Sequence, residues 1–309
     1  MESVFNRLPD GLIILDGGMG QELINRNVSG QGVLWSAKAL FDNPAAVQAV
    51  HEDYIRAGAD VITANSYACI RNNFEPEGLL GRLGEMNQLA AMLARQARDK
   101  LGKKVLIAGS MGPQNGSYRP DLVGSYDVTE ALYREQAGFL APHVDLFICE
   151  TLSCIREARA AAVAAVSTGK PVWLSWSIED SGAPNLRSGE SIRAAWDDVA
   201  DLDVSAVLLN CSPPEAISNV LPQLLALSDV PVGAYANAFT PIPEKWDFHG
   251  NTSIPPSRTD VTPQAYADHA ANWLKAGARI IGGCCEVGPD HITRLSQKLR
   301  PSTTVQCPG

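Results

Sequence analysis

Three cysteines are the most reactive set of side chains in the sequence. Cys284 and Cys285 are adjacent and follow two glycines, and Cys211 stands between an asparagine and a serine. Zinc prefers thiolate and imidazole ligands, and a catalytic zinc site leaves one position free for water or substrate. Three cysteines brought together would form such a site. Taken alone, each is as well explained as a small buried apolar residue, so the prediction depends on where the fold places them.

Two carboxylates also follow apolar segments. Glu150 comes directly after a short apolar run, where a carboxylate is costly to bury unless it meets a cation or hydrogen-bond donors. It is therefore predicted to bind a substrate ammonium or to act as a base. Asp16 has the same potential, although an aspartate before glycine is also a common turn residue. Further polar residues, each of which could instead bond to loop backbone, follow other apolar runs: Asn65, Ser66, Ser110, Ser177, Tyr235 and Asn237.

Segments with strand and helix patterns alternate regularly along the chain. Short, continuously apolar segments are typical of strands buried on both faces, and they occupy residues 12–15, 61–64, 105–108, 146–149, 172–178, 206–209, 232–236 and 279–281. Segments with helical periodicity lie between and after them, at residues 44–57, 79–101, 129–143, 153–167, 188–200, 213–226, 263–276 and 289–299. Within the fourth strand, Cys149 should point away from Glu150, toward the helices.

Eight alternations of strand and helix predict the α/β class and a single-domain (β/α)8 TIM barrel over residues 1–309, with a loose tail from about residue 301. A doubly wound open sheet is the alternative. Long loops follow the first, third and seventh strands, at about 17–43, 111–127 and 237–261. The loops after the strands build the active site of a barrel. The cysteines and carboxylates should therefore meet at one mouth, with Trp246 and His249 packing in a lid.

Composition narrows the class of protein. The net charge is −9 and no run of Lys or Arg occurs, which argues against nucleic acid as a partner. No apolar window approaches the roughly 18 residues of a membrane span, and no signal peptide is expected at the start. Seven cysteines, two of them adjacent, suit a reducing compartment, so a cytoplasmic location is predicted. Small-molecule substrates are the expected partners, and nothing indicates the oligomeric state. Four histidines are expected on the surface or at helix ends: His51, His143, His269 and His291.

Taken together, five motifs resemble the homocysteine S-methyltransferase family over roughly residues 10–300. In chain order they are Asp16-Gly-Gly-Met-Gly, Thr63-Ala-Asn-Ser-Tyr, Cys149-Glu-Thr-Leu, Asn210-Cys-Ser and Gly282-Gly-Cys-Cys. The segment Leu34-Trp-Ser-Ala-Lys is similar to the S-methylmethionine-dependent bacterial and plant members. The pair formed by the last two motifs is specific, whereas Asp-Gly-Gly alone is weak.

The resemblance implies zinc as the cofactor, held by Cys211, Cys284 and Cys285. It also implies that Asp16 and Glu150 help to hold the amino acid part of homocysteine. Coordination to zinc would deprotonate the homocysteine thiol, whose pKa near 8.5 or above otherwise keeps it protonated. The thiolate would then attack the methyl group of an onium donor and give methionine. The residues predicted to bind substrate are Asp16, Glu150, Asn65, Ser66, Asn210 and Tyr235.

The methyl donor is the least determined part of this prediction. The chain ends soon after the eighth helix, so the C-terminal extension of betaine-dependent relatives and the folate and cobalamin modules of methionine synthase are not expected. A small sulfonium, S-methylmethionine or S-adenosylmethionine, is predicted instead. Loops set such choices, and segments 115–122 and 240–261 do not closely match any donor-defined subgroup.

Other functions stay open. They are a betaine- or other onium-dependent thiol or selenol methyltransferase, a non-catalytic zinc- or thiol-binding barrel, and a zinc lyase or hydrolase with Glu150 as base. The last usually has His or carboxylate ligands.

Overall fold

A closed barrel of parallel strands forms the centre of the molecule. The computed structural model describes residues 11–28, 32–243, 246 and 254–300. Their eight strands are hydrogen-bonded in the order β1-β8-β7-β6-β5-β4-β3-β2. A parallel bridge between Leu15 and Val61 joins the two end strands and closes the sheet. The strands are β1 (Ile13–Ile14), β2 (Val61–Thr63), β3 (Leu106–Met111), β4 (Leu146–Leu152), β5 (Val172–Trp176), β6 (Ala206–Asn210), β7 (Val232–Tyr235) and β8 (Ile280–Ile281).

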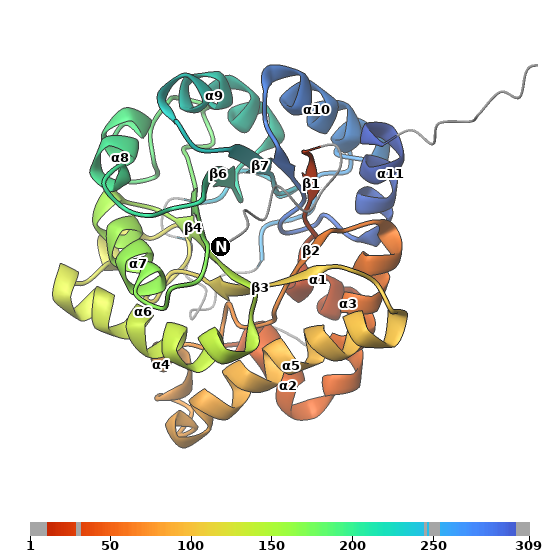
Figure 1. Ribbon diagram of the computed structural model, residues 1–309, viewed down its shortest axis with the longest axis vertical. Helices are drawn as coiled ribbons and strands as arrows, with labels where there is room; N and C mark the ends of the chain where they lie inside the picture. Colours follow the sequence, from red (N-terminus) through yellow and green to blue (C-terminus); the bar gives the residue numbers. More distant parts are fainter. Residues whose placement is uncertain (1–10, 29–31, 244–245, 247–253, 301–309) are drawn as a thin grey trace, which may run out of the picture.

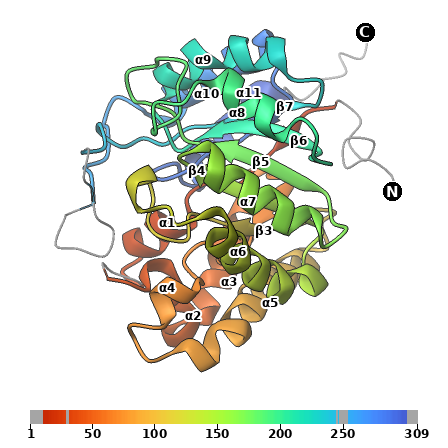
Figure 2. The same cartoon turned by 90° about the vertical axis from the view of Figure 1, so that its left-hand side faces the viewer.

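Helices surround this barrel (Figure 1). In the described part of the chain each strand is followed by a main helix: α3 (Pro44–Ala57), α5 (Leu83–Leu101), α6 (Tyr126–Leu140), α7 (Ile155–Val166), α8 (Ile192–Val199), α9 (Pro214–Leu227), α10 (Pro263–Ala276) and α11 (Pro289–Leu299). From the side, α9, α10 and α11 lie across the strands from α2, α3 and α5 (Figure 2). The predicted (β/α)8 barrel is confirmed.

Local signals explain why three helices keep their predicted bounds. The side chains of Asn43 and Thr262 cap α3 and α10 by accepting backbone N–H groups, and a proline stands at the first turn of α3, α10 and α11. Gly58 ends α3 with a φ of +105° and Gly277 ends α10 with a φ of +126°. Only glycine adopts such backbone angles without strain, so these helices end where the sequence predicts.

The long loops contain short helices that the sequence prediction did not include. The segment after β1 holds α1 (Met19–Asn25), a 3-10 turn η2 (Trp35–Ala37) and α2 (Lys38–Asp42). The segment before α5 holds α4 (Arg71–Phe74) and a 3-10 turn η3 (Leu80–Arg82), so the helix predicted over 79–101 begins differently. Elements of one or two turns are too short to show a full apolar period. Two further 3-10 turns are η4 (Pro120–Leu122) and η5 (Ala141–His143).

Side chains alternate between two buried layers along each strand. Ile13, Leu15 and Trp173 belong to the cluster that fills the barrel, whereas Ile14 belongs to the layer between strands and helices. Cys149 lies in that outer layer, where its Sγ is 3.6 Å from the carbonyl oxygen of Ala161 in α7. The predicted orientation of this cysteine is confirmed, and its neighbour Glu150 consequently faces inward.

His51 corrects the expectation that it lies on the surface or at a helix end. It sits in α3, which packs against α5 and α11, and none of it is exposed. Burial lowers the pKa of its imidazole to about 3, and neither ring nitrogen has a partner among the described residues. A helix covered on two sides has a wider buried face than the apolar pattern of one helix indicates.

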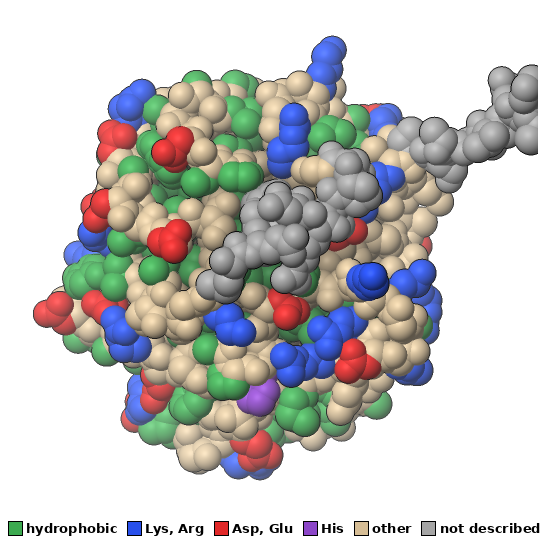
Figure 3. Space-filling model, viewed as in Figure 1, with side chains coloured by type: hydrophobic (Ala, Val, Ile, Leu, Met, Phe, Trp, Pro, Cys, Tyr) green, Lys and Arg blue, Asp and Glu red, His purple; other side chains and the backbone are tan. Residues whose placement is uncertain are grey.

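Two surface features complete the description. Lys, Arg, Asp and Glu side chains are interspersed over the coloured part of the face in Figure 3. None of the helices in the described ranges combines the length and apolar character needed to cross a membrane. The tail predicted from about residue 301 and His249 lie outside the described residues.

Candidate metal and substrate site

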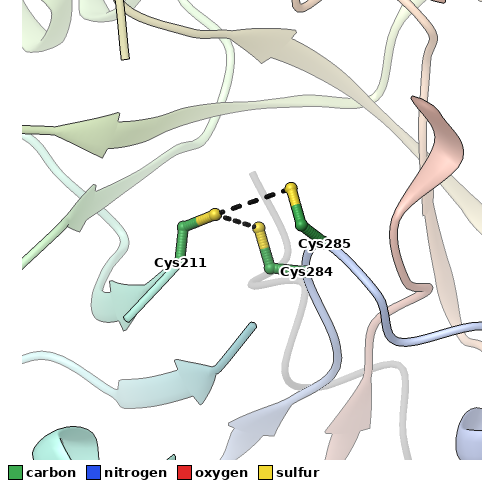
Figure 4. A group of neighbouring side chains, drawn as sticks. All are labelled: Cys211, Cys284 and Cys285. Atoms are coloured by element: carbon green, nitrogen blue, oxygen red, sulfur yellow. Dashed lines mark hydrogen bonds between the residues drawn. The ribbon is translucent and has the colours of Figure 1, made fainter. Parts of the chain in front are cut away.

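The three cysteines converge at the mouth of the barrel. Cys211 directly follows β6, and Cys284 and Cys285 follow β8 after two glycines. Their ligand atoms all lie within 4.8 Å of one another, with the Sγ of Cys211 2.7 Å from that of Cys284 and 3.8 Å from that of Cys285 (Figure 4). Residues far apart in the chain thus provide three sulfurs that point toward one position.

Glycines permit this close packing of backbone. A Cβ on Gly283 would lie 2.1 Å from the side chain of Val287, and a Cβ on Gly18 would lie 2.7 Å from the carbonyl oxygen of Cys284. Real Cβ atoms essentially never approach other atoms so closely, so any larger residue would push the cysteine turn out of place. The Gly-Gly pairs before the cysteines and after Asp16 therefore have one shared purpose, which is to let the β1 and β8 loops pack together.

The thiols influence one another strongly. Burial disfavours ionisation of Cys211, but hydrogen bonds from Cys284, Cys285 and Tyr118 outweigh it and lower the pKa of Cys211 well below its usual range. The pKa values of Cys284 and Cys285 are raised, first by their hydrogen bonds with Cys211 and then by burial, although the bond with Cys284 opposes the shift of Cys285. One thiolate shared by three sulfurs is an arrangement suited to a soft cation.

Asp16 lies at the closure of the barrel. Its carboxylate accepts hydrogen bonds from the backbone N–H of Thr63 (2.6 Å) and from the Thr63 hydroxyl (2.9 Å). Burial raises the pKa of Asp16 to about 8, although the bonds from Thr63 oppose this shift. The aspartate therefore links β1 to β2 as well as lining the pocket.

Glu150 faces the same pocket from β4. Its carboxylate accepts hydrogen bonds from the Ser110 hydroxyl (2.5 Å) and the Tyr235 hydroxyl (3.2 Å). Burial raises its pKa to about 7. In the described ranges neither Asp16 nor Glu150 pairs with a Lys or Arg, although Asp16 is 3% and Glu150 9% exposed. Two buried carboxylates without a protein cation can accept a cationic group from a ligand.

The remaining residues predicted to bind substrate divide into two pairs. Asn65 and Tyr235 line the pocket, and the Asn65 amide donates to the carbonyl oxygen of Ser36 (2.9 Å). Ser66 and Asn210 are not among the residues that line it. The hydroxyl of Ser66 donates to the carbonyl oxygen of Ser110 (2.8 Å), which ties β2 to β3.

Asn210 supports the end of β4 from the neighbouring strands. Its side-chain oxygen accepts from the backbone N–H of Thr151 and from the Ser175 hydroxyl, and its amide donates to the Thr151 hydroxyl, all at 2.9 Å. Thr151 has a φ of +62°, a left-handed conformation that is unfavourable for a β-branched residue. By holding Thr151, the buried Asn210 also holds Glu150 in the strand position before it.

Aromatic residues form much of the rest of the pocket, whose volume is about 890 Å³ and part of which opens to solvent. Tyr118 was not predicted as a site residue, yet its hydroxyl lies 2.9 Å from the Sγ of Cys211. The only signal for it is its place in a long loop after a strand. The rings that line the pocket are Trp35, Tyr67, Tyr118, Tyr235, Phe239 and Trp246.

Comparison with known proteins agrees with this geometry. The family model described as homocysteine S-methyltransferase matches residues 13–299. The homocysteine S-methyltransferase of Escherichia coli is 32% identical, over 93% of this chain and 95% of its own length. The chain belongs to the homocysteine S-methyltransferase family.

Two further comparisons concern a plant methyltransferase and a solved structure. The selenocysteine methyltransferase of Astragalus bisulcatus is 28% identical, over 93% of this chain and 92% of its own length. The crystal structure of the metallated homocysteine methyltransferase MmuM from E. coli is 30% identical and superposes with a TM-score of 0.78, over 93% of this chain and 96% of that one. As a member of the family, the chain is a methyltransferase.

Proposed function

We propose that this enzyme transfers a methyl group from a small sulfonium, S-methylmethionine or S-adenosylmethionine, to the thiol of homocysteine, with Zn²⁺ as its cofactor. The observation that carries the proposal is the convergence of three sulfurs within 4.8 Å in the same pocket as two buried carboxylates that pair with no Lys or Arg of the described residues. The three sulfurs would bind a soft metal, and the two carboxylates would bind the ammonium of an amino acid.

The three sulfur ligands fit zinc and leave one coordination position for a substrate. Three cysteine sulfurs without a nearby histidine or carboxylate ligand in the described residues favour a thiophilic metal over magnesium or calcium. Cys211, Cys284 and Cys285 would hold the ion. When bound, zinc supplies a positive charge that favours the thiolate form of a substrate thiol at neutral pH.

The protein's own groups would orient the acceptor. Glu150 and Asp16 would bind the homocysteine ammonium, and the hydroxyls of Ser110 and Tyr235 keep the Glu150 carboxylate in place. Fixing the amino acid end positions its thiol relative to the donor methyl group, and orientation of two reactants is a large part of such catalysis. Aromatic faces such as Trp246 would favour a cationic donor and exclude water from the reaction.

Metal analysis and a donor screen test this proposal together. Purified enzyme should contain about one zinc per chain. Incubation with homocysteine and a donor carrying a trideuterated methyl group should give methionine with that label, as measured by mass spectrometry. S-methylmethionine, S-adenosylmethionine and betaine would be compared in parallel, and transfer from a sulfonium is expected. Zinc without turnover on any of these donors would contradict the proposal and favour a binding role.

A further inference from the structure

Tyr118 joins the cysteine cluster to two long loops. It lies in the loop after β3, is 7% exposed, and places its hydroxyl 2.9 Å from the Sγ of Cys211. Its ring packs against that of Trp246 in the loop after β7, with 5.8 Å between the centroids. Its φ is +63°, a left-handed conformation that strains a non-glycine residue. Such strain persists only where the surroundings hold the residue firmly.

A fixed cation lies over the same ring. The guanidinium carbon of Arg187 is 4.5 Å from the ring centroid of Tyr118. Arg187 donates to Asp180 (2.6 Å) and to the Ser177 hydroxyl (2.7 Å), and its side chain is only 10% exposed. The other oxygen of Asp180 accepts the backbone N–H of Ile242 (2.8 Å), near Trp246. A cation over the ring face draws electron density from the phenol, which makes its hydroxyl a stronger hydrogen-bond donor.

The hydrogen bond with Tyr118 distinguishes Cys211 from the other two cysteines. As a metal ligand, Cys211 would be a thiolate without a proton, so the hydrogen bond can run only from Tyr118 to sulfur. In the described parts of the chain, neither Cys284 nor Cys285 receives a side-chain hydrogen bond from oxygen or nitrogen at its sulfur. One sulfur of three therefore has a donor that withdraws charge from it.

We propose that Tyr118 is a positioning residue of the metal centre, whose hydroxyl orients Cys211 and reduces the charge on its sulfur, and that Arg187 strengthens this hydrogen bond. The inference rests on the proposed function, since it presupposes a metal on the three cysteines. Partners that hydrogen-bond to metal ligands fix their orientation and tune the metal. Here the tuning group comes from the loop that also borders the substrate pocket, so metal and substrate recognition are physically connected.

The first test uses metal binding rather than turnover. Tyr118→Phe keeps the ring contacts with Trp246 and Arg187 and removes only the hydroxyl. We expect zinc affinity, measured by competition with a chromophoric chelator, to fall about tenfold or more. In the cobalt-substituted protein, the sulfur-to-cobalt charge-transfer band should move to lower energy, because a sulfur without its hydrogen bond gives up an electron more easily. Tyr126→Phe, at the start of α6, is the control and should change neither.

A double-mutant cycle tests whether Arg187 strengthens the hydrogen bond from Tyr118 to Cys211. Arg187→Met should shift the cobalt band in the same direction as Tyr118→Phe but by less, and should cause no further shift in the Tyr118→Phe background. An unchanged band together with zinc affinity within about twofold of the parent in Tyr118→Phe would overturn the inference. An equal shift from Arg187→Met in both backgrounds would overturn the role of Arg187. Failure of the parent protein itself to bind zinc or cobalt would instead overturn the proposed function.

Discussion

The cysteine side of the pocket and its aromatic side are held in place by different means. The backbone N–H groups of Cys211 and Cys284 bond to the carbonyl oxygens of Tyr235 (3.1 Å) and Ala236 (2.9 Å), so both cysteines extend the pairing of the sheet. Tyr118 and Trp246 instead lie within long loops and contact each other through their rings. The cysteine side is part of the barrel, whereas the aromatic side is formed by loops outside it.

This difference predicts how well each side of the pocket tolerates substitutions. A side chain at a strand end is fixed by the rigid barrel, so the chemistry that needs precise geometry belongs there. Loops vary more readily and carry specificity. Substitutions at the strand ends should therefore impair metal binding, acceptor binding or turnover itself, whereas substitutions in the loops, apart from Tyr118 beside Cys211, should mainly change which donor is used and how well.

The largest effect is expected at the cysteines. Cys284→Ser should lower zinc content to a small fraction of the parent value and reduce kcat/KM by more than the roughly 100-fold typical of losing an indirect metal contact. Zinc content by mass spectrometry and steady-state turnover measure the two effects. Cys154→Ser is the matched control, because Cys154 precedes α7 away from the pocket and serine is a good residue for a helix start. Full zinc content in Cys284→Ser would contradict the proposal that Cys284 is a metal ligand.

Glu150→Gln should weaken acceptor binding without removing the metal. A hydrogen bond to a charged group contributes about 1.5–3 kcal/mol, so kcat/KM for homocysteine should fall roughly 10- to 100-fold. The KM for the donor should change little. Glu157→Gln provides the control, since Glu157 is also buried but lies in α7 and bonds to the backbone N–H of Ser153. Equal losses in both variants would show a general effect of removing a buried carboxylate.

The pH dependence of ligand binding should report the same carboxylate. Burial raises the pKa of Glu150 to about 7, so its charge is lost as the pH falls below 7 and the ligand ammonium loses its counter-ion. Affinity for the product methionine, which has no thiol to ionise, should fall by up to about tenfold between pH 8 and pH 6. Titration calorimetry measures this. The dependence should become shallower in Glu150→Gln, where Asp16, with a pKa of about 8, still loses its charge over this range. An unchanged slope there would assign the whole dependence to Asp16.

A smaller and more selective effect is expected in the aromatic loop. Trp246→Ala should raise the KM for the sulfonium donor about two- to thirtyfold, since a cation–π contact contributes roughly 0.5–2 kcal/mol. Zinc content and the KM for homocysteine should stay near the parent values. Steady-state kinetics with each substrate varied in turn separate these parameters. Loss of zinc in this variant would mean that Tyr118 needs the ring of Trp246 to hold its position against Cys211.

Much of the fold was predictable because its signals are local. Buried parallel strands produce continuous apolar runs, and prolines, caps and glycines mark helix ends within a few residues. The strand-end position of Asp16, Glu150 and the cysteines followed from that pattern, because a barrel brings all carboxyl ends of its strands to one mouth. The roles proposed for these residues stay predictions until the experiments above are made.

Local sequence signals were enough to predict the barrel, its active face and the residues at the strand ends, since each depends on neighbours in the chain. The contacts between side chains of different loops could be seen only in the folded molecule. Tyr118 and Cys211 are 93 residues apart, and no spacing rule relates them. The structure also shows that Asn210 and Ser66 do not line the pocket and that His51 lies inside the helical layer. Such contacts depend on how loops and helices pack against one another, which no local pattern of residues encodes.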